Sequence, residues 1–297
     1  MRLPCLCCHS VEFKNIGEKN NFKIDICKKC KTLSADNNSQ IENNFDYNDY
    51  YSEDAENIPD FVFERLIEIV QEFSKYRQSG RLLDVGCGAG TILKAALDDN
   101  WQAEGVEVSA SSIKFLRKNN FKVFHGEIME AAFPENHFDV IVASEIIEHI
   151  PEPQKLLDES YRTLRSGGLF WGTTPHGQGL SGKFLGSDWS CVLPPEHLHL
   201  LSVKGLHIML EKAGFRQIEV KTHSINPYEI IEGLKKLLKS KDKSVNTSEE
   251  AFDYVKTSYE LNETMINSPL RKNIKKLINA VLNITSLGDS LKIKAVK

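Results

Sequence analysis

The chain has 297 residues, 41% of them apolar and 26% charged, and a formal net charge of −4 at pH 7. This composition indicates a folded protein with a sizeable core, and the acidic balance argues against a dedicated polyanion-binding protein. No apolar run approaches the roughly 18 residues that a membrane-spanning helix needs, and the first residues do not open a secretory signal. We therefore expect a cytoplasmic protein with no transmembrane segment.

Four of the seven cysteines lie in two pairs near the N-terminus. Cys5 and Cys8 form one C-x2-C pair and Cys27 and Cys30 form the other, with 18 residues between the pairs. This is the spacing of a four-cysteine zinc ribbon, and a segment this short and polar needs the metal to fold. We predict that residues 1–33 hold one structural Zn²⁺, with a redox-active pair as the alternative.

Residues 34–78 are expected to form a linker and then a helix. Residues 34–60 are rich in Asn, Asp, Ser and Tyr, and they include Tyr51. From residue 61 to residue 76 the apolar side chains recur at helical spacing, which predicts a helix in front of the next domain.

Strand and helix patterns alternate from residue 79 onward. The predicted strands are 81–85, 102–108, 121–124, 138–143, 168–174 and 215–222, and the predicted helices are 91–99, 110–118, 153–165 and 202–213. This alternation predicts an α/β fold with a doubly wound parallel sheet. Residues 288–296 alternate as a half-buried final strand should, and residues 226–287 before them are expected to be a helical insertion.

The first predicted strand and helix meet at a candidate cofactor site. A glycine-rich turn follows the strand, and an acid closes the next strand about 20 residues further on. The residues concerned are Asp84, Gly86, Cys87, Gly88, Gly90 and Glu107. Glycines let the backbone approach a ligand, a helix N-terminus attracts an anionic group, and Glu107 can accept both hydroxyls of a ribose. The pattern predicts a nucleotide-cofactor site, with a purely structural turn as the alternative.

The glycine spacing G-x-G-x-G resembles motif I of class I S-adenosylmethionine-dependent methyltransferases. Residues 138–153 resemble the fourth strand of these enzymes and the loop that follows it, and residues 164–170 resemble the turn into their fifth strand. The resemblance implies a Rossmann-like seven-stranded methyltransferase sheet over residues 79–297 and S-adenosylmethionine as the cofactor. It also places Glu127 near the adenine amino group and Ser144 beside the cofactor.

Three histidines are candidates for the chemistry at the methyl acceptor. His149 follows the fourth strand, with Glu145 one helical turn before it. His197 and His199 stand two residues apart, so that an extended backbone places both on one face. Methyl transfer to a hydroxyl requires alignment and removal of a proton, which imidazole can accept near neutral pH. We predict that His197 is the base and that His149 is the second candidate, with His199 as a further one; a structural role is the alternative for each.

A closer resemblance joins these features. The ribbon, a tyrosine before the core, the histidine after strand four and the Glu196–His197 segment together resemble the zinc-ribbon sugar methyltransferases of deoxysugar and surface-glycan pathways. The resemblance implies that His149, Glu196 and His197 line a sugar site and that Tyr51 lies near the methyl group. Enzymes of the C-methylating branch have a tyrosine where this chain has Pro194. Methylation of oxygen is therefore favoured, with C-methylation as an alternative.

The expected substrate is a sugar or related small molecule, free or linked to a nucleotide or lipid. An RNA methyltransferase that grips nucleic acid with the ribbon is the main rival, because residues 1–40 hold 7 Lys and Arg against 4 Asp and Glu. The chain has no Arg-rich stripe and no aromatic stacking platform, which disfavours nucleic acid as a partner. A non-catalytic scaffold is a third alternative.

The segments outside the core carry further expectations. Residues 235–297 hold 13 Lys and Arg against 7 Asp and Glu, and the insertion places apolar residues on one side of its helices. We expect a cap over the substrate cleft, with peripheral contact to anionic lipid as the alternative. The glycine content of residues 172–182 predicts a mobile loop at the mouth of the site. For Trp189 we expect either stacking on a sugar or a role as an interface anchor.

Overall fold

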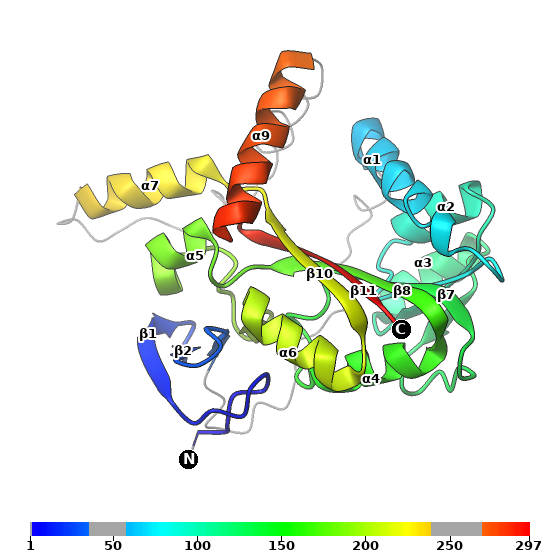
Figure 1. The fold of residues 1–297 in the computed structure, drawn as a ribbon, viewed down its shortest axis with the longest axis horizontal. Coiled ribbons are helices and arrows are strands. Elements are labelled where there is room, and N and C mark those ends of the chain that lie inside the picture. The colour runs from blue at the N-terminus through cyan, green and yellow to red at the C-terminus, as the bar shows by residue number, and fades with distance from the viewer. Residues whose placement is uncertain (1, 36–57, 239–268) are drawn as a thin grey trace.

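A computed structural model describes residues 2–35, 58–238 and 269–297, and its main feature is a seven-stranded sheet (Figure 1). The strand order is β10-β11-β8-β7-β4-β5-β6. The strands are β4 (Arg81–Val85), β5 (Gln102–Glu107), β6 (Val123–His125), β7 (Phe138–Ser144), β8 (Leu164–Pro175), β10 (Arg216–His223) and β11 (Ser290–Val296). Strands β4 to β8 pair in parallel, and β11 runs antiparallel between β8 and β10. The predicted Rossmann-like seven-stranded sheet is confirmed, and its last strand in the sequence, β11, is antiparallel to both neighbours.

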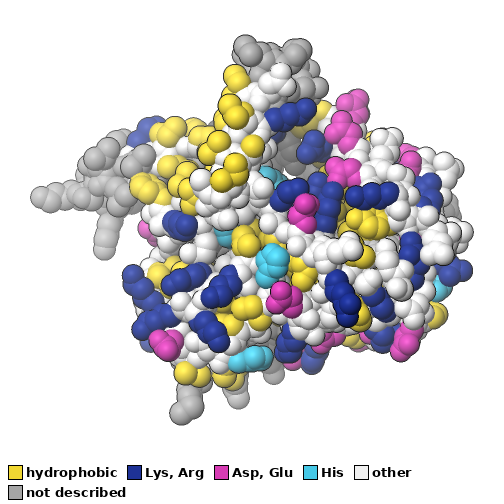
Figure 2. All heavy atoms as spheres, in the orientation of Figure 1, with side chains coloured by type: hydrophobic (Ala, Val, Ile, Leu, Met, Phe, Trp, Pro, Cys, Tyr) yellow, Lys and Arg dark blue, Asp and Glu magenta, His cyan; other side chains and the backbone are white. Residues whose placement is uncertain are grey.

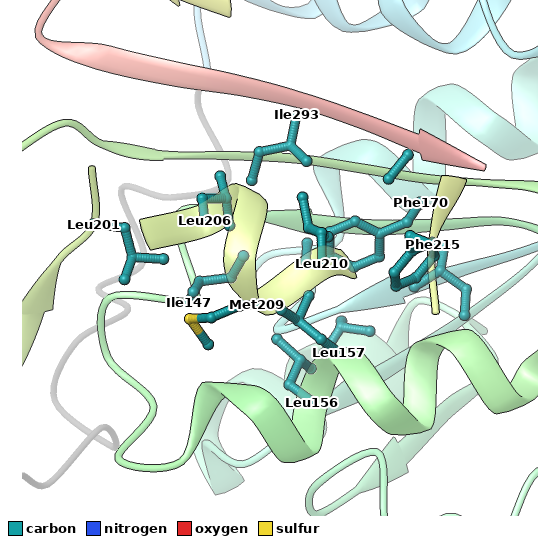
Figure 3. Close-up of a cluster of buried hydrophobic side chains, with 14 of the residues drawn as sticks. Ile147, Leu156, Leu157, Phe170, Leu201, Leu206, Met209, Leu210, Phe215 and Ile293 are labelled. Carbon is teal, nitrogen blue, oxygen red and sulfur yellow. The ribbon is translucent and has the colours of Figure 1, made fainter. Parts of the chain in front are cut away.

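Helices cover both faces of this sheet. They are α1 (Asp60–Gln71), α2 (Thr91–Asp98), α3 (Ala110–Lys118), α4 (Pro153–Thr163) and α6 (Val203–Ala213). Successive residues of β8 serve opposite faces, since Phe170 packs with α4 and α6 while Trp171 packs with α1 and α2. Figure 3 shows the first of these clusters, in which Leu157, Met209 and Phe215 surround Phe170. Each fully buried side chain of this size contributes roughly 1.5–3 kcal/mol to stability.

The glycine-rich segment after β8 is packed rather than open. Residues 172–175 belong to β8, residues 180–185 form α5 (Leu180–Leu185), and His176 between them is buried. A Cβ on Gly177 would lie 2.6 Å from the carbonyl oxygen of Leu200, so the backbone is in tight contact there. The prediction of a loop over residues 172–182 was wrong, because the glycines serve close packing.

The N-terminal cysteine segment forms a second, four-stranded sheet. Its strands are β1 (Phe13–Lys19), β2 (Phe22–Cys27), β3 (Leu33–Ala35) and β9 (His199–Leu200), in that order. Strand β9 comes from the α/β part of the chain and pairs with β3 through Leu33 opposite Leu200. Trp189 is 2% exposed in the apolar cluster at this junction. It anchors the two parts of the molecule, which is one of the two roles expected for it, and its burial excludes the other role, stacking on a sugar.

Two helices come from the predicted insertion, α7 (Pro227–Leu238) and α9 (Pro269–Thr285), while residues 239–268 lie outside the described part. The base of α9 is held to β10, because Asn283 Oδ1 accepts the backbone N–H of Thr222 at 3.1 Å. Figure 2 shows hydrophobic side chains over α9. Leu277 of this helix is 68% exposed and Ile284 is 83% exposed. Within the described ranges, no helix combines the length and apolar character needed to cross a bilayer.

Asp139 ties the start of β7 to the segment that leads into β4. Its Oδ2 accepts the backbone N–H groups of Gln78, Ser79 and Gly80 at 2.9, 2.7 and 2.6 Å, and its Oδ1 accepts Arg165 Nε. Burial opposes the charge of this carboxylate, but the N–H of Gln78, the guanidinium of Arg165 and the other donors hold its pKa below the ordinary value. The carboxylate is therefore ionised in the folded protein.

Replacement of Asp139 by Ala should lower the free energy of unfolding by about 3–5 kcal/mol, because Arg165 and three N–H groups lose their acceptor. The exposed Asp158→Ala change on α4 is the control and should stay within about 0.5 kcal/mol of wild type. Urea unfolding at pH 7 measures both, and equal midpoints would contradict the assignment. Since the folded-state pKa is lowered, this stabilisation should be lost as the pH falls below the unfolded pKa of about 3.9.

Candidate functional site

The glycine turn after β4 adopts a backbone that only glycine adopts easily. Gly86, Gly88 and Gly90 have φ values of 68°, 52° and 76°, all in the left-handed region. A Cβ on Gly86 would lie 2.6 Å from Ile146 Cδ1, so this turn and the loop after β7 are in direct contact. Helix α2 begins at Thr91 just beyond the turn, and its first backbone N–H groups are suited to an anionic group of a ligand.

Glu107 at the end of β5 braces the same turn. Its Oε2 accepts the N–H of Gly88, and its Oε1 accepts the N–H groups of Val108 and Ser109, all at 2.8 Å. Oε2 accepts only one of these N–H groups and so has a further lone pair with which to accept a ribose hydroxyl. Burial, and then the charge of Glu107, raises the pKa of Asp84 well above its ordinary value.

The other predicted cofactor residues lie at the same edge of the sheet. Ser144 ends β7, where its Oγ lies 2.9 Å from Thr173 Oγ1, and Glu127 is exposed after β6. Cys87 is buried, and burial raises the pKa of its thiol, so it is a packing residue of the turn. Tyr51 lies outside the described residues. In open α/β sheets, ligands bind at this carboxyl edge.

A cluster of two carboxyl and two imidazole groups, which we call the acid–imidazole cluster, lies beside the turn. It consists of Glu145, Glu148, His149 and His197. The rings of His149 and His197 meet edge to face with centroids 4.7 Å apart. Glu148 is 1% exposed; its Oε2 accepts the hydroxyl of Thr174 at 2.8 Å, and its Oε1 lies 3.9 Å from His149 Nε2.

Burial sets the protonation of this cluster. It lowers the pKa of His149 to about 4, assisted by the charge of His197, so His149 is neutral near pH 7 and a weak proton acceptor. Burial and then the adjacent Glu145 raise the pKa of Glu148 well above its ordinary value, and burial also raises that of Glu145. Glu145 has φ of 51°, a conformation that costs a non-glycine residue about 1–2 kcal/mol.

The remaining predicted catalytic residues are held by backbone contacts. The carbonyl oxygen of Glu196 accepts His149 Nδ1 at 3.1 Å, and that of Cys191 accepts His197 Nδ1 at 2.7 Å. The Glu196 carboxylate lies 3.9 Å from His197 Nε2. His199 sits apart in β9, where it contacts the carbonyl of Pro151 and burial lowers its pKa to about 4.

Glu148 was missed as a site residue, although a sequence signal was present. Glu145, Glu148 and His149 form an E-x-x-E-H pattern directly after a buried strand. Residues three apart in a helical turn share one face, so the two carboxyls of this pattern were predictable as neighbours. The proximity of His197 to these two carboxyl groups was not predictable, because His197 lies about 50 residues further along the chain.

The four paired cysteines converge within the small sheet. The Sγ atoms of Cys5 and Cys30 lie 3.4 Å apart, those of Cys8 and Cys27 lie 3.5 Å apart, and all four lie within 4.8 Å of one another. A tetrahedral Zn²⁺ with Zn–S bonds of about 2.3 Å needs sulfurs about 3.8 Å apart, so the set fits zinc. Cys7 is buried outside this set, with its Sγ 3.4 Å from Thr32 Oγ1.

Comparison with known proteins agrees with this architecture. Residues 59–220 match a family described as a methyltransferase domain. The chain is 30% identical over 151 residues to a probable S-adenosylmethionine-dependent methyltransferase of Mycolicibacterium smegmatis, covering 50% of this chain and 57% of that protein. It is 25% identical over 161 residues to a ubiquinone biosynthesis O-methyltransferase of Thiobacillus denitrificans, covering 50% of this chain and 69% of that protein.

Among solved structures, an Archaeoglobus fulgidus S-adenosylmethionine-dependent methyltransferase superimposes with a TM-score of 0.55 at 22% identity. The superposition covers 85% of this chain and all of that chain. Because the family match spans more than half of the sequence, the chain belongs to the class I S-adenosylmethionine-dependent methyltransferases.

Replacement of Glu107 by Ala should weaken S-adenosylmethionine binding by about 1–3 kcal/mol, because the acceptor of the ribose hydroxyls and a brace of the turn are lost together. Calorimetry on the folded variant measures this. Glu104→Ala on the same strand is the control and should bind like wild type, since Glu104 pairs with Lys122 at 2.7 Å. Unchanged affinity in Glu107→Ala would remove this residue from the cofactor site.

Cys27→Ser should lose the metal of the cysteine cluster, because an alcohol is a poor zinc ligand in a thiolate site. Elemental analysis should give one zinc per chain in wild type and much less than one in the variant. Cys7→Ser is the matched control and should keep its zinc. Full zinc content in Cys27→Ser would exclude this ligand set.

Proposed function

We propose that this methyltransferase transfers the methyl group to a hydroxyl oxygen of a sugar or a related small polyhydroxylated molecule. The observation that carries the proposal is the acid–imidazole cluster beside the glycine turn, with Ile146 of its loop in contact with Gly86. A hydroxyl acceptor must lose its proton during transfer, and this cluster brings proton-accepting groups to the cofactor's edge of the sheet.

The cofactor supplies an activated methyl group on a sulfonium, so the residues of this chain have two tasks. The glycine turn and Glu107 hold the cofactor in one orientation, and the cluster orients the acceptor oxygen and deals with its proton. Such displacements are accelerated largely because the enzyme holds the reacting atoms aligned and about 3–3.5 Å apart.

Two further observations support a sugar as the substrate and a hydroxyl oxygen as the methyl acceptor. The relative in Thiobacillus denitrificans is named as an O-methyltransferase. The ribbon with its Glu196–His197 segment resembles sugar methyltransferases, and the structure joins this segment to the ribbon through β9. The proposed base remains His197, because burial lowers the pKa of His149 and leaves His149 a weak proton acceptor.

The test is transfer of labelled methyl from S-adenosylmethionine to a panel of nucleotide-linked sugars, free sugars, phenols and RNA. Transfer to a sugar hydroxyl, with the O-methyl product identified by NMR, is the expected result. Transfer to RNA alone, or to a sugar carbon, would overturn the proposal.

His197→Ala should lower turnover about 10²–10⁴-fold, the range for loss of a group that handles the proton, while cofactor affinity stays nearly unchanged. His207→Ala on α6 is the matched control and should retain wild-type turnover. Turnover of His197→Ala within a few-fold of wild type would remove His197 from the acceptor site.

A further inference from the structure

The acid–imidazole cluster has a feature that proton transfer alone does not require, namely that its donor atoms converge. One ligand atom each from Glu148, His149 and His197 lie within 4.8 Å of one another. Glu148 Oε1 lies 3.9 Å from His149 Nε2, and Glu196 Oε1 lies 3.9 Å from His197 Nε2. Both distances are too long for a hydrogen bond, yet the Glu148 and His149 atoms face each other.

Backbone contacts fix which nitrogen of each ring points inward. A carbonyl oxygen only accepts, so His149 Nδ1 carries the proton that Glu196 accepts, and His197 Nδ1 carries the one that Cys191 accepts. In the neutral rings the inward Nε2 atoms therefore hold lone pairs. A second ring nitrogen that donates to a carbonyl is the arrangement by which proteins orient histidine ligands of metal ions.

A hydrogen bond also orients one of the carboxyl groups. Thr174 donates to Glu148 Oε2 and leaves Oε1 directed at His149. Glu145 adjoins Glu148, and two carboxylates this close resist ionising together unless a cation stands between them. The cluster thus offers two imidazole nitrogens and carboxylate oxygens, at a site next to the cofactor turn.

We propose that Glu148, His149 and His197, with Glu145 beside them, bind a divalent transition-metal ion distinct from the metal of the cysteine cluster. A ligand set of imidazole and carboxylate without thiolate suits Mn²⁺, Fe²⁺ or Zn²⁺. An ion with bonds of about 2.1 Å needs ligand atoms about 3.0–3.4 Å apart, so the side chains close by about an ångström on binding.

This site deepens the proposed function and rests on it for its role. A bound ion would polarise the acceptor hydroxyl and lower its pKa, and the hydroxyl proton would pass to the carboxylate of Glu145. The acceptor oxygen then bonds to the methyl carbon as the carbon–sulfur bond breaks, and the electron pair of that bond stays on sulfur, giving S-adenosylhomocysteine. With the ion bound, His197 would hold the ion and Glu145 would take the proton, so the metal site would replace the free-base role that the proposed function gives to His197.

The test counts Mn²⁺ bound by the full chain with zinc already in the cysteine cluster, because a four-thiolate site does not exchange its zinc for Mn²⁺ readily. Electron paramagnetic resonance of free Mn²⁺ during a titration should show one ion bound per chain. Glu148→Gln and His197→Gln should each weaken this binding at least about tenfold. His207→Gln is the control and should bind Mn²⁺ like wild type.

Zinc content near one and wild-type affinity for S-adenosylmethionine show that each variant is folded. No Mn²⁺ binding by wild type, or equal binding by wild type and both cluster variants, would overturn the metal site while leaving methyl transfer to a sugar untouched. Binding of Mn²⁺ by a protein that methylates no sugar would instead uphold the site and reject the proposed function.

Discussion

The acid–imidazole cluster, which is the proposed acceptor side of this protein, depends on a few backbone hydrogen bonds made by residues 198–200. On one side, Ala35 N donates to the carbonyl of Leu198 at 3.1 Å and β9 pairs with β3 of the cysteine-bearing sheet. On the other, Leu198 N donates to the carbonyl of Glu148 at 2.9 Å. The same short segment therefore belongs to the small sheet and to the loop after β7, and it carries His197 into the acid–imidazole cluster.

Further contacts brace this junction from the cysteine-bearing sheet. Ser202 Oγ donates to the carbonyl of Cys30 and also caps α6 by accepting Gly205 N at 2.9 Å. At the tip of the β1–β2 hairpin, Lys19 donates to the carbonyl of Trp189 and Asn20 to that of Pro194. The cofactor turn does not depend on contacts with the cysteine-bearing sheet, because Glu107 and the glycines are held by the large sheet. On this account, a metal in the cysteine cluster would support the proposed acceptor side and leave the cofactor turn unaffected.

Much of the large sheet was predictable, because alternating strand and helix patterns and the glycine turn are local in the chain. Strand β4, helix α2 and the antiparallel β11 lie within two residues of their predicted bounds. The junction was not predictable, since β9 is two residues long and pairs with a strand more than 160 positions earlier. Trp189 was ambiguous for the same reason: burial at a junction between distant segments leaves no periodicity in the sequence. The loop predicted over residues 172–182 was wrong because close packing and loop flexibility both favour glycine, as at Gly177 and Gly179.

The central claim is that the cysteine cluster supports the acceptor segment and not the cofactor turn. Hydrogen exchange followed by mass spectrometry tests it directly, on wild type with zinc and on the same protein after chelation of the zinc. We predict faster amide exchange in residues 196–202, unchanged exchange in residues 82–90, and unchanged affinity for S-adenosylmethionine. Unchanged protection of residues 196–202 after complete loss of zinc, or equal loss of protection in both segments, would contradict the account.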